Sequence, residues 1–526
     1  MTVTGAAMAS LPWWSPAWPF LLVCFIPLLL VEQDLRNEGG GTLSVLPFAF
    51  GFFLLWNLLV TWWMARIHFA GGMTVIILNA MVMSAVFLLF SAVRRTTGGG
   101  AAVFVILWTA FEFLHHRGDL SWPWLSLGNG LAGSPSIIQW YEYTGMTGGS
   151  LWVLMVNAML FAGIAGYHRF ALRKKAILVS ALVSATTIIL PLAVSLIMYK
   201  NYNGSEGIPE RKSFLVLQPV IDPYAGNSGG ISNMQRLDQL LGMAAEATGP
   251  DIDIIVTPET SVDSVWLDDP GDGIILGISE FMNLYNPAIV IAGATTFHHV
   301  PPAGKSVTTR QDNLGRHYEV QNSALYFLSG KFQEAYHKYY LANGVEQVPF
   351  GRLSGVLERL TVDLGGVSGS LKPGEGASVF SPLSDKHGKY PVLGTLICFE
   401  SSYGEYAGQM VGKGAEILLV ISNDGWFKNT GAYRQHLRMS VIRAVETRRD
   451  IVRSANAGVS CHISGRGDIT ARLDWWQEGA LIVRPAANDK ITFFVRSGDY
   501  TGRAALFFSF LVVLNFIVRR FSGVVR

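Results

Sequence analysis

Val392-Leu-Gly-Thr-Leu-Ile397 is an apolar segment that leads directly into Cys398, Phe399 and Glu400. Its length and branched side chains predict a buried β-strand, because a strand that is covered on both faces of a sheet is apolar nearly throughout. The composition of Tyr403–Val411 predicts a helix a few residues further on. We therefore expect Cys398 to lie where a strand ends and the chain turns towards a helix.

Two other segments also place a charged side chain where a β-strand is expected to end. Ile254-Ile-Val-Thr-Pro258 leads into Glu259, and Tyr336-His-Lys338 lies between that segment and Cys398. In a sheet that is covered by helices, catalytic and binding residues gather at the carboxyl ends of the strands and in the loops after them. These three segments therefore predict a shared site.

The sequence around these segments predicts an α/β domain. Short β-rich segments alternate with amphipathic helical ones, and the strands are apolar nearly throughout, which favours layered sheets. The further strands expected are 214–217, 253–256, 288–292, 324–327 and 417–421, and the helices are 233–247, 403–411 and 432–448.

The flanking sequence is typical of a membrane protein. The chain is 50% hydrophobic and 15% charged, and its mean hydropathy is +0.33. Six segments are long and apolar enough to cross a bilayer: Ser44–Ala65, Met73–Val93, Gly100–Leu114, Gly149–Tyr167, Ala176–Tyr199 and Ala504–Val518. A further apolar stretch precedes Glu32 and lacks the basic start and cleavage site of a signal peptide. It forms either one membrane helix or two short ones.

We therefore predict three parts: a transmembrane helical bundle over residues 1–200, an extracytoplasmic domain over 201–502, and a membrane helix with a cytoplasmic tail over 503–526. The orientation follows from basic residues in short loops, which stay in the cytoplasm. They are Arg94, Arg95, Arg169, Arg173, Lys174, Lys175, Arg519, Arg520 and Arg526. All of these can lie on the cytoplasmic side only if residues 201–502 lie on the other side.

Charge and cysteine content exclude several classes of function. Lys plus Arg (40) nearly balances Asp plus Glu (38), so no basic field favours nucleic acid. Three scattered cysteines do not form a disulfide framework, and the paired histidines His115–His116 and His298–His299 lack the spacing of metal ligands. We expect neither a metal nor another cofactor.

The residue types at the three strand ends fit acyl transfer. A cysteine is a strong nucleophile only as a thiolate, so Cys398 needs a base within reach. Glu259 can take the thiol proton and return it to a leaving group. Lys338 can stabilise the oxyanion of a tetrahedral intermediate, and Glu346 can keep Lys338 protonated. Cys461 is expected to be dispensable.

The order of these residues resembles the nitrilase superfamily, whose members use a Glu, a Lys and a Cys in this order. With membrane spans on both sides, the whole chain is similar to the bacterial apolipoprotein N-acyltransferases, which commonly have eight spans. The similar segments are Pro258-Glu259-Thr260, Asn322-Ser323, Tyr336-His337-Lys338 with Glu346, Ile397-Cys398-Phe399-Glu400, Ser422-Asn423-Asp424-Gly425-Trp426-Phe427 and Ala455-Asn456-Ala457-Gly458.

Two segments depart from the family pattern. Tyr340-Leu-Ala-Asn-Gly-Val-Glu346 replaces the usual Leu-Val-Pro-Phe-Gly-Glu, although the glutamate keeps its place. After Gln218, family members often carry a tryptophan that contributes to function, whereas this chain reads Pro-Val-Ile-Asp-Pro-Tyr224-Ala. The role of Tyr224 stays open.

The resemblance implies an α-β-β-α sandwich inserted in a bundle of seven to eight spans, in a monomer of the bacterial inner membrane. Cys398 would attack a phospholipid ester with help from Glu259 and form a thioester. The α-amine of a diacylglyceryl-cysteine at an apolipoprotein N-terminus would then take the acyl chain. Phe399, Glu400 and Asn322 would support the site.

Trp426 and Phe427 would bind substrate or pack beneath the site. The apolar segments Trp122-Pro-Trp124 and Val348–Leu360 would grip acyl chains or belong to ordinary packing. No nucleic-acid partner is expected.

Two other functions compete with this one. A membrane-tethered amidase would use the same three residues, with water resolving the thioester, but one anchor would suffice for it. A transporter with an accessory domain is disfavoured, because the spans carry Glu112 and few other charges. No pair of helices broken by Gly or Pro marks a substrate site at mid-membrane.

Overall fold

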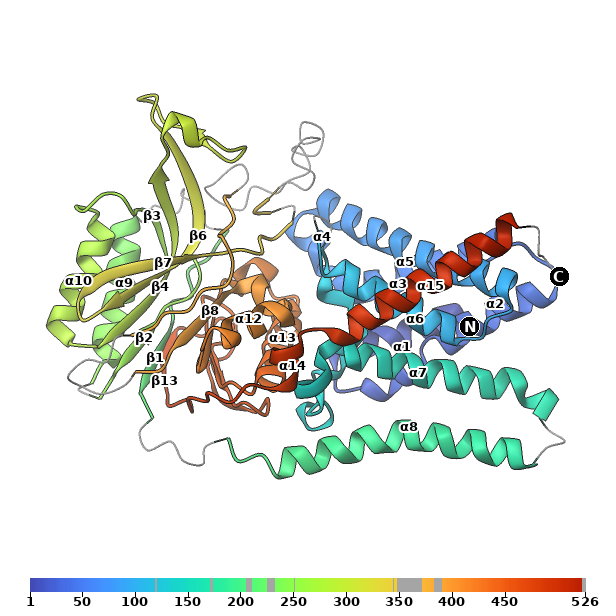
Figure 1. The fold of residues 1–526 in the computed structure, drawn as a ribbon. Coiled ribbons are helices and arrows are strands. Elements are labelled where there is room, and N and C mark those ends of the chain that lie inside the picture. The colour runs from blue at the N-terminus through green and yellow to red at the C-terminus, as the bar shows by residue number, and fades with distance from the viewer. Residues whose placement is uncertain are drawn as a thin grey trace. The chain divides into compact units, whose positions relative to one another are not determined.

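The structure is a computed structural model. It describes residues 1–118, 121–170, 174–204, 211–224, 232–249, 251–343, 345–347, 371–382 and 390–522. The chain divides into two compact units, one formed by Met1–Tyr202 with Ser497–Arg526 and the other by Asn203–Arg496 (Figure 1).

The first unit is helical. Its α-helices are α1 (Thr2–Trp14), α2 (Ile26–Asn37), α3 (Leu46–Thr61), α4 (Trp63–Ile67), α5 (Phe69–Thr97), α6 (Ala102–His115), α7 (Tyr141–Phe170), α8 (Lys174–Lys200) and α15 (Tyr500–Phe521). Short 3-10 helices cover Trp18–Leu22, Thr42–Val45, Pro123–Leu125, Leu127–Leu131 and Pro135–Ile137.

Among the described residues, six helical segments are long and apolar enough to cross a membrane: Trp18–Asn37, Thr42–Thr61, Phe69–Thr97, Tyr141–Ala165, Ala181–Lys200 and Tyr500–Phe521. The span expected at Gly100–Leu114 forms α6, which has only 14 residues. The first apolar stretch forms two helices rather than one. Ser15, with φ −144° and ψ 167°, is extended because it precedes Pro16, and a residue before proline disfavours the helical conformation.

Aromatic side chains fill the interior of the helical unit. The ring of Phe25 lies 5.3 Å from that of Trp108 and 5.5 Å from that of Phe52, and all three are fully buried. Trp124 is 1% exposed and its ring lies 5.0 Å from that of Trp63. Trp124 therefore belongs to ordinary packing, which was one of its two expected roles.

The second unit contains two sheets. The eight-stranded sheet has the order β13-β1-β2-β4-β6-β5, with β3 paired to β4 and β7 paired to β6; the five-stranded sheet has the order β12-β11-β10-β9-β8. The strands are β1 (Phe214–Gln218), β2 (Ile254–Val256), β3 (Val262–Trp266), β4 (Ile289–His299), β5 (Arg310–Gln311), β6 (His317–Leu328), β7 (Lys331–His337), β8 (Leu393–Ile397), β9 (Ile417–Ser422), β10 (Ile451–Ala455), β11 (Cys461–Ile463), β12 (Ile469–Arg472) and β13 (Gly479–Val483). Each expected strand and helix of this unit is present.

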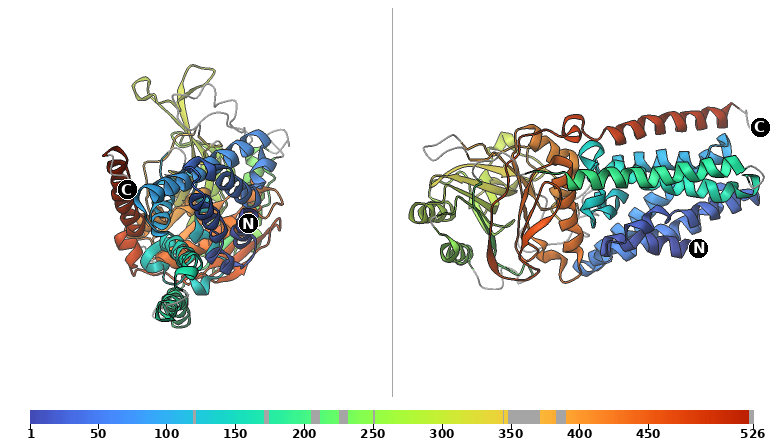
Figure 2. Two further views of the ribbon diagram at one scale, coloured as in Figure 1. Left: turned by 90° about the vertical axis from the view of Figure 1, so that its right-hand side faces the viewer. Right: turned by 90° about the horizontal axis from the view of Figure 1, so that it is seen from below.

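Helices cover the outer face of each sheet, so the second unit is an α-β-β-α sandwich (Figures 1 and 2). α9 (Asn233–Ala247) and α10 (Gly273–Tyr285) share a buried apolar core with the eight-stranded sheet. α12 (Gly404–Gly412) and α13 (Ala432–Thr447) lie beside the five-stranded sheet, and α14 (Phe493–Ser497) follows near the end of the unit. The two sheets meet directly, since the Ser454 hydroxyl on β10 donates to the Leu217 carbonyl on β1 at 2.9 Å.

Strand direction brings two of the expected strand ends to one edge. β2 and β4 are parallel, β4 and β6 are antiparallel, and β6 and β7 are antiparallel, so β7 runs in the direction of β2. The residues after β2 and after β7 therefore leave the same edge of the eight-stranded sheet.

Candidate active site

Glu259 lies in the loop after β2 and is 5% exposed. A glycine on the neighbouring strand makes room for this loop, because a Cβ atom at Gly293 would lie 2.0 Å from the Pro258 carbonyl oxygen. The Asn423 backbone N–H, just after β9, donates to Glu259 Oε2 at 2.8 Å. The carboxylate is thus held by both sheets.

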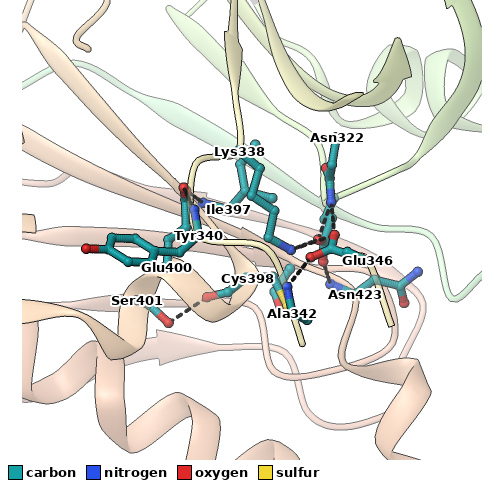
Figure 3. A network of polar contacts seen from close by, with 12 residues as sticks. Asn322, Lys338, Tyr340, Ala342, Glu346, Ile397, Cys398, Glu400, Ser401 and Asn423 are labelled. Carbon is teal, nitrogen blue, oxygen red and sulfur yellow. Dashed lines mark hydrogen bonds and ion pairs between the residues drawn. The ribbon is translucent and has the colours of Figure 1, made fainter. Parts of the chain in front are cut away.

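Lys338 follows β7 and is 2% exposed. Its Nζ donates to Glu259 Oε1 and to Glu346 Oε1, each at 2.9 Å. The Asn322 Nδ2 on β6 donates to the same two oxygens at 2.8 Å. Figure 3 shows Lys338, Asn322 and Glu346 pointing towards one another beside Cys398. The second oxygen of Glu346 accepts from the Ala342 backbone N–H at 2.7 Å.

Cys398 is the first residue after β8 and begins the 3-10 helix Cys398–Ser402. Its φ of 52° lies in the left-handed region, which costs a residue other than glycine about 1–3 kcal/mol. The side chain is partly exposed, and its thiol interacts electrostatically with the Glu259 carboxylate. Such a strained turn presents the sulfur at the end of the strand instead of burying it in the sheet.

The pKa values of these groups determine which of them are charged in the resting site. Burial raises the pKa of Cys398, and the Glu259 carboxylate raises it further. Burial also raises the pKa of Glu259, but the charge and hydrogen bonds of Lys338 outweigh this effect and lower it. Burial lowers the pKa of Lys338, but Glu259 and Glu346 hold it well above its usual range. At neutral pH the resting site therefore holds a neutral thiol beside an ionised carboxylate. Glu259 has the protonation state of a general base, while both pKa shifts oppose the transfer of the thiol proton.

Glu400 joins the segment that carries Lys338 to the segment that carries Cys398 through hydrogen bonds. It is fully buried and its Oε1 accepts from the Tyr339 backbone N–H at 2.7 Å, while Oε2 accepts from the Ile397 backbone N–H at 2.8 Å. The Tyr336 hydroxyl donates to the same carboxyl group at 2.7 Å. Burial raises the pKa of Glu400 to about 7. Its neighbour Phe399 is 8% exposed, and its ring lies 5.5 Å from that of Tyr403.

Trp426 and Phe427 lie in the 3-10 helix Asp424–Phe427 and are both half-buried. The Tyr224 hydroxyl donates to the Trp426 carbonyl at 2.7 Å, and the two rings meet edge to face at 5.3 Å. The Phe427 ring lies 5.9 Å from that of His436. Val348–Leu360, the other expected acyl-chain segment, lies outside the described residues.

The structure adds groups to which the sequence reasoning assigned no role. They are the Asn423 backbone N–H, Tyr336, and a buried set formed by Asp424, His436 and Arg453. Asn423 and Asp424 directly follow the apolar strand β9. The strand-end rule that drew attention to Cys398 therefore applied to them too. In the described parts of the chain, no three His, Cys, Asp or Glu side chains are grouped to hold a metal ion.

This arrangement can carry out nucleophilic acyl transfer. A sulfur nucleophile, a carboxylate base and a fixed cation lie together in a buried site, and the cation can stabilise charge on an acyl oxygen. An α-β-β-α domain with such a Glu–Lys–Cys site defines the carbon–nitrogen hydrolase class. Residues 231–487 match the family model described as carbon-nitrogen hydrolase. Residues 5–159 match the model described as apolipoprotein N-acyltransferase N-terminal domain.

Three relatives are similar to this chain over most of its length. The chain is 24% identical to the apolipoprotein N-acyltransferase of Chlorobaculum tepidum over 96% of this chain and 94% of that protein. It is 26% identical to that of Geobacter metallireducens over 95% and 91%, and 27% identical to that of Thermotoga maritima over 79% and 70%. The chain belongs to the apolipoprotein N-acyltransferase family. It is therefore a membrane protein and an acyltransferase, and the amidase alternative is not favoured.

Solved structures are also similar to part of the chain. Saccharomyces cerevisiae Nit3, a member of branch 10 of the nitrilase superfamily, is 17% identical with a TM-score of 0.37, covering 56% of this chain and 96% of that one. An amidase from Nesterenkonia is 16% identical with a TM-score of 0.37, covering 58% and 97%.

Proposed function

We propose that this protein transfers a fatty acyl chain from a membrane phospholipid, through a thioester on Cys398, to the α-amine of a diacylglyceryl-cysteine at the N-terminus of an apolipoprotein. The observation that carries the proposal is the buried Glu259 carboxylate. It interacts electrostatically with the Cys398 thiol while Lys338 donates to its Oε1 at 2.9 Å, in a chain whose described residues include six apolar helical segments of membrane-spanning length.

In the first half-reaction, Glu259 takes the thiol proton and the sulfur attacks the ester carbonyl carbon of the phospholipid. Lys338 stabilises the negative oxygen of the tetrahedral intermediate, which is where the largest gain from a fixed cation is expected. The ester C–O bond then breaks, and Glu259 returns the proton to the leaving oxygen. The products are the Cys398 thioester and a lysophospholipid.

In the second half-reaction, the lipoprotein α-amine attacks the thioester carbon and Glu259 accepts a proton from the nitrogen. The C–S bond breaks as the amide forms, and Glu259 returns that proton to the sulfur. Asn322 and Glu346 position Lys338 and Glu259 throughout. Glu400 and Phe399 shape the turn around Cys398, and Trp426 and Phe427 contact the acyl chain.

The membrane setting completes the proposal. Both substrates are anchored in a bilayer, so an enzyme with its own spans encounters them by diffusion within the plane of the membrane. The ends of α7 and α15 and the start of α8 lie at one end of the helical unit (Figure 1). They carry five of the basic residues expected in the cytoplasm, namely Arg169, Lys174, Lys175, Arg519 and Arg520. We assign the α/β unit to the periplasmic side of the inner membrane, in a chain that acts as a monomer.

Mass spectrometry of the purified full chain tests the first half-reaction. Incubation with phospholipid alone should add the mass of one acyl chain to Cys398, and hydroxylamine should remove it. A Cys398→Ala variant should stay folded and gain no mass, whereas Cys461→Ala should behave as the natural protein does. Acylation that persists in Cys398→Ala at the natural rate contradicts the mechanism.

Addition of a diacylglyceryl peptide to the acyl-enzyme tests the second half-reaction. The acyl chain should move to the peptide amine as an amide. Release of free fatty acid alone, together with rapid hydrolysis of small amides, would favour the amidase alternative instead.

A further inference from the structure

Two loops that border the candidate site are joined to each other by an asparagine. Asn456, just after β10, donates through Nδ2 to the Ile221 carbonyl at 2.6 Å and to Asn423 Oδ1 at 3.0 Å. Its Oδ1 accepts from the Ile221 N–H at 2.8 Å. Asn423 is also the residue whose N–H donates to Glu259. The loop after β1 and the loop after β9 therefore form one continuous wall beside Glu259.

A lysine on this wall is held over an aromatic ring. Lys428 Nζ lies 4.4 Å from the centre of the Tyr224 ring, and the Tyr224 hydroxyl donates to the Trp426 carbonyl at 2.7 Å. Lys428 is half-buried, and its φ of 49° lies in the left-handed region. Such a conformation costs free energy and persists where the surrounding structure enforces it, often at functional sites. The strained turn and the ring together hold the ammonium group in place.

The main chain keeps Lys428 near the reacting groups. Asn423 directly precedes the 3-10 helix Asp424–Phe427, and Lys428 directly follows it. A 3-10 helix rises about 2 Å per residue, so about 10 Å separates the two main-chain positions. In a phospholipid, the glycerol carbons place the phosphate only a few bonds from the ester that Cys398 would attack. Lys428 can therefore meet the phosphate of a lipid whose ester lies at the sulfur.

The charges of the site are unfavourable for an anionic substrate. The Glu259 and Glu346 carboxylates and the Lys338 ammonium together carry one net negative charge. Asp424 and Arg453 pair at 2.8 Å and add no net charge. A net negative charge repels the phosphodiester of a phospholipid, and the low dielectric of a buried site strengthens that repulsion.

A cation at the edge of the site offsets this repulsion, and Lys428 supplies one. An ammonium group forms charge-assisted hydrogen bonds with phosphate oxygens, which are stronger than those between neutral groups. The Asp222 carboxylate, which accepts from the Tyr224 N–H at 2.9 Å, also belongs to this wall. Asp222 is exposed, so water and salt screen its charge more than that of the half-buried lysine.

We propose that Lys428 binds the phosphate of the donor phospholipid, so that the site selects esters that carry a phosphodiester over neutral esters. The inference deepens the proposed function and rests on it for Cys398 as the nucleophile and for a phospholipid as the donor. Tyr224 and Trp426 hold the ammonium group where the phosphate arrives.

The phosphatidylglycerol concentration that gives half-maximal acylation of Cys398 tests the proposal, measured by mass spectrometry of the full chain in detergent. Lys428→Met keeps the length of the side chain and removes its charge, so this concentration should rise about tenfold or more. Acylation by p-nitrophenyl hexanoate, an ester without phosphate, should stay unchanged. Arg434→Met is the matched control, because Arg434 is an exposed cation that also lies over a tyrosine ring, 5.5 Å from that of Tyr433. It should change neither measurement.

A folded Lys428→Met protein with the natural half-maximal concentration overturns the proposal. An equal loss of acylation by both esters, or an equal rise in Arg434→Met, overturns it too. If Lys428→Met does not fold, Lys428→Asn replaces it, because asparagine adopts the left-handed conformation more easily than most residues.

Failure of phosphatidylglycerol to acylate Cys398 in the natural protein would contradict the proposed function, and native mass spectrometry then decides on Lys428 alone. Lys428→Met should bind fewer phosphatidylglycerol molecules than the natural protein at equal lipid concentration, with diacylglycerol binding unchanged. Equal phosphatidylglycerol binding by the two proteins overturns the proposal.

Discussion

Asn322 and Lys338 donate to the same two carboxylate oxygens from neighbouring strands. The Asn322 amide lies 2.8 Å from Glu259 Oε1 and from Glu346 Oε1, and the Lys338 ammonium lies 2.9 Å from each. Their main chains are also joined, because the Lys338 N–H donates to the Asn322 carbonyl at 2.8 Å. The four side chains form a closed ring in which two acceptors alternate with two donors. The general base Glu259 is therefore held by a neutral donor, Asn322, as well as by a charged donor, Lys338.

Asn322→Ala should lower the rate of Cys398 acylation about 10- to 100-fold. A hydrogen bond to a charged group contributes about 1.5–3 kcal/mol, and a factor of ten corresponds to about 1.4 kcal/mol. Rapid-quench mass spectrometry of the acyl-enzyme measures this rate. Gln333→Ala, an exposed position on β7, serves as the control. An unchanged rate in Asn322→Ala would show that Lys338 and the Asn423 N–H orient the carboxylate without Asn322.

Glu346→Gln should lower the same rate by a comparable factor without unfolding the chain. A carboxylate at this position accepts from Lys338 and from the Ala342 N–H through its two oxygens. An amide has one oxygen, so one of these donors would face an NH₂ group. Glu375→Gln, an exposed glutamate, is the control. A rate in Glu346→Gln equal to that of the control would contradict a positioning role.

Glu400 should make the stability of the α/β unit depend on pH. In the folded protein, its pKa of about 7 lies above the ordinary glutamate value of 4.5. The folded state therefore retains a proton that the unfolded state has lost. This contribution to stability is fully present below about pH 4.5 and is lost as the pH rises towards 7. The melting temperature of the natural protein should therefore fall between pH 5 and 7 relative to that of Glu400→Gln, measured by tryptophan fluorescence. Parallel curves for the two proteins would be inconsistent with the raised pKa.

Cys461→Ala should lower stability slightly and leave acyl transfer unchanged. The Cys461 side chain is fully buried on β11, so removing its sulfur costs about 1 kcal/mol. Its register partner is Arg453, and no contact joins it to the Glu259–Lys338 pair in the described structure. Melting temperature and acylation rate, measured on the same preparation, check both parts. A loss of acylation at unchanged stability would reveal a chemical role for this thiol.

Much of the α/β unit could be predicted from local sequence. The strands around Leu393–Ile397 and Ile417–Ser422 are apolar nearly throughout, because both their faces are covered. That pattern also placed Cys398 and Glu259 at strand ends, which is where the structure has them. The break in the first apolar stretch has a local signal as well, since Pro16 follows the extended Ser15.

The partners within the site depend on contacts between residues far apart in the chain. Asn322 meets Lys338 through the register of β6 and β7, and Glu400 reaches the Tyr339 N–H from the other sheet. The Asn423 N–H reaches Glu259 across 164 residues, and His436 reaches the Cys398 carbonyl oxygen from a helix. The sequence by itself determined which side chains end each strand, because the apolar composition of a segment shows that the segment is buried. Only the tertiary structure decided which donors face which acceptors, because hydrogen bonds depend on the ångström-scale register of strands and sheets that local composition does not encode.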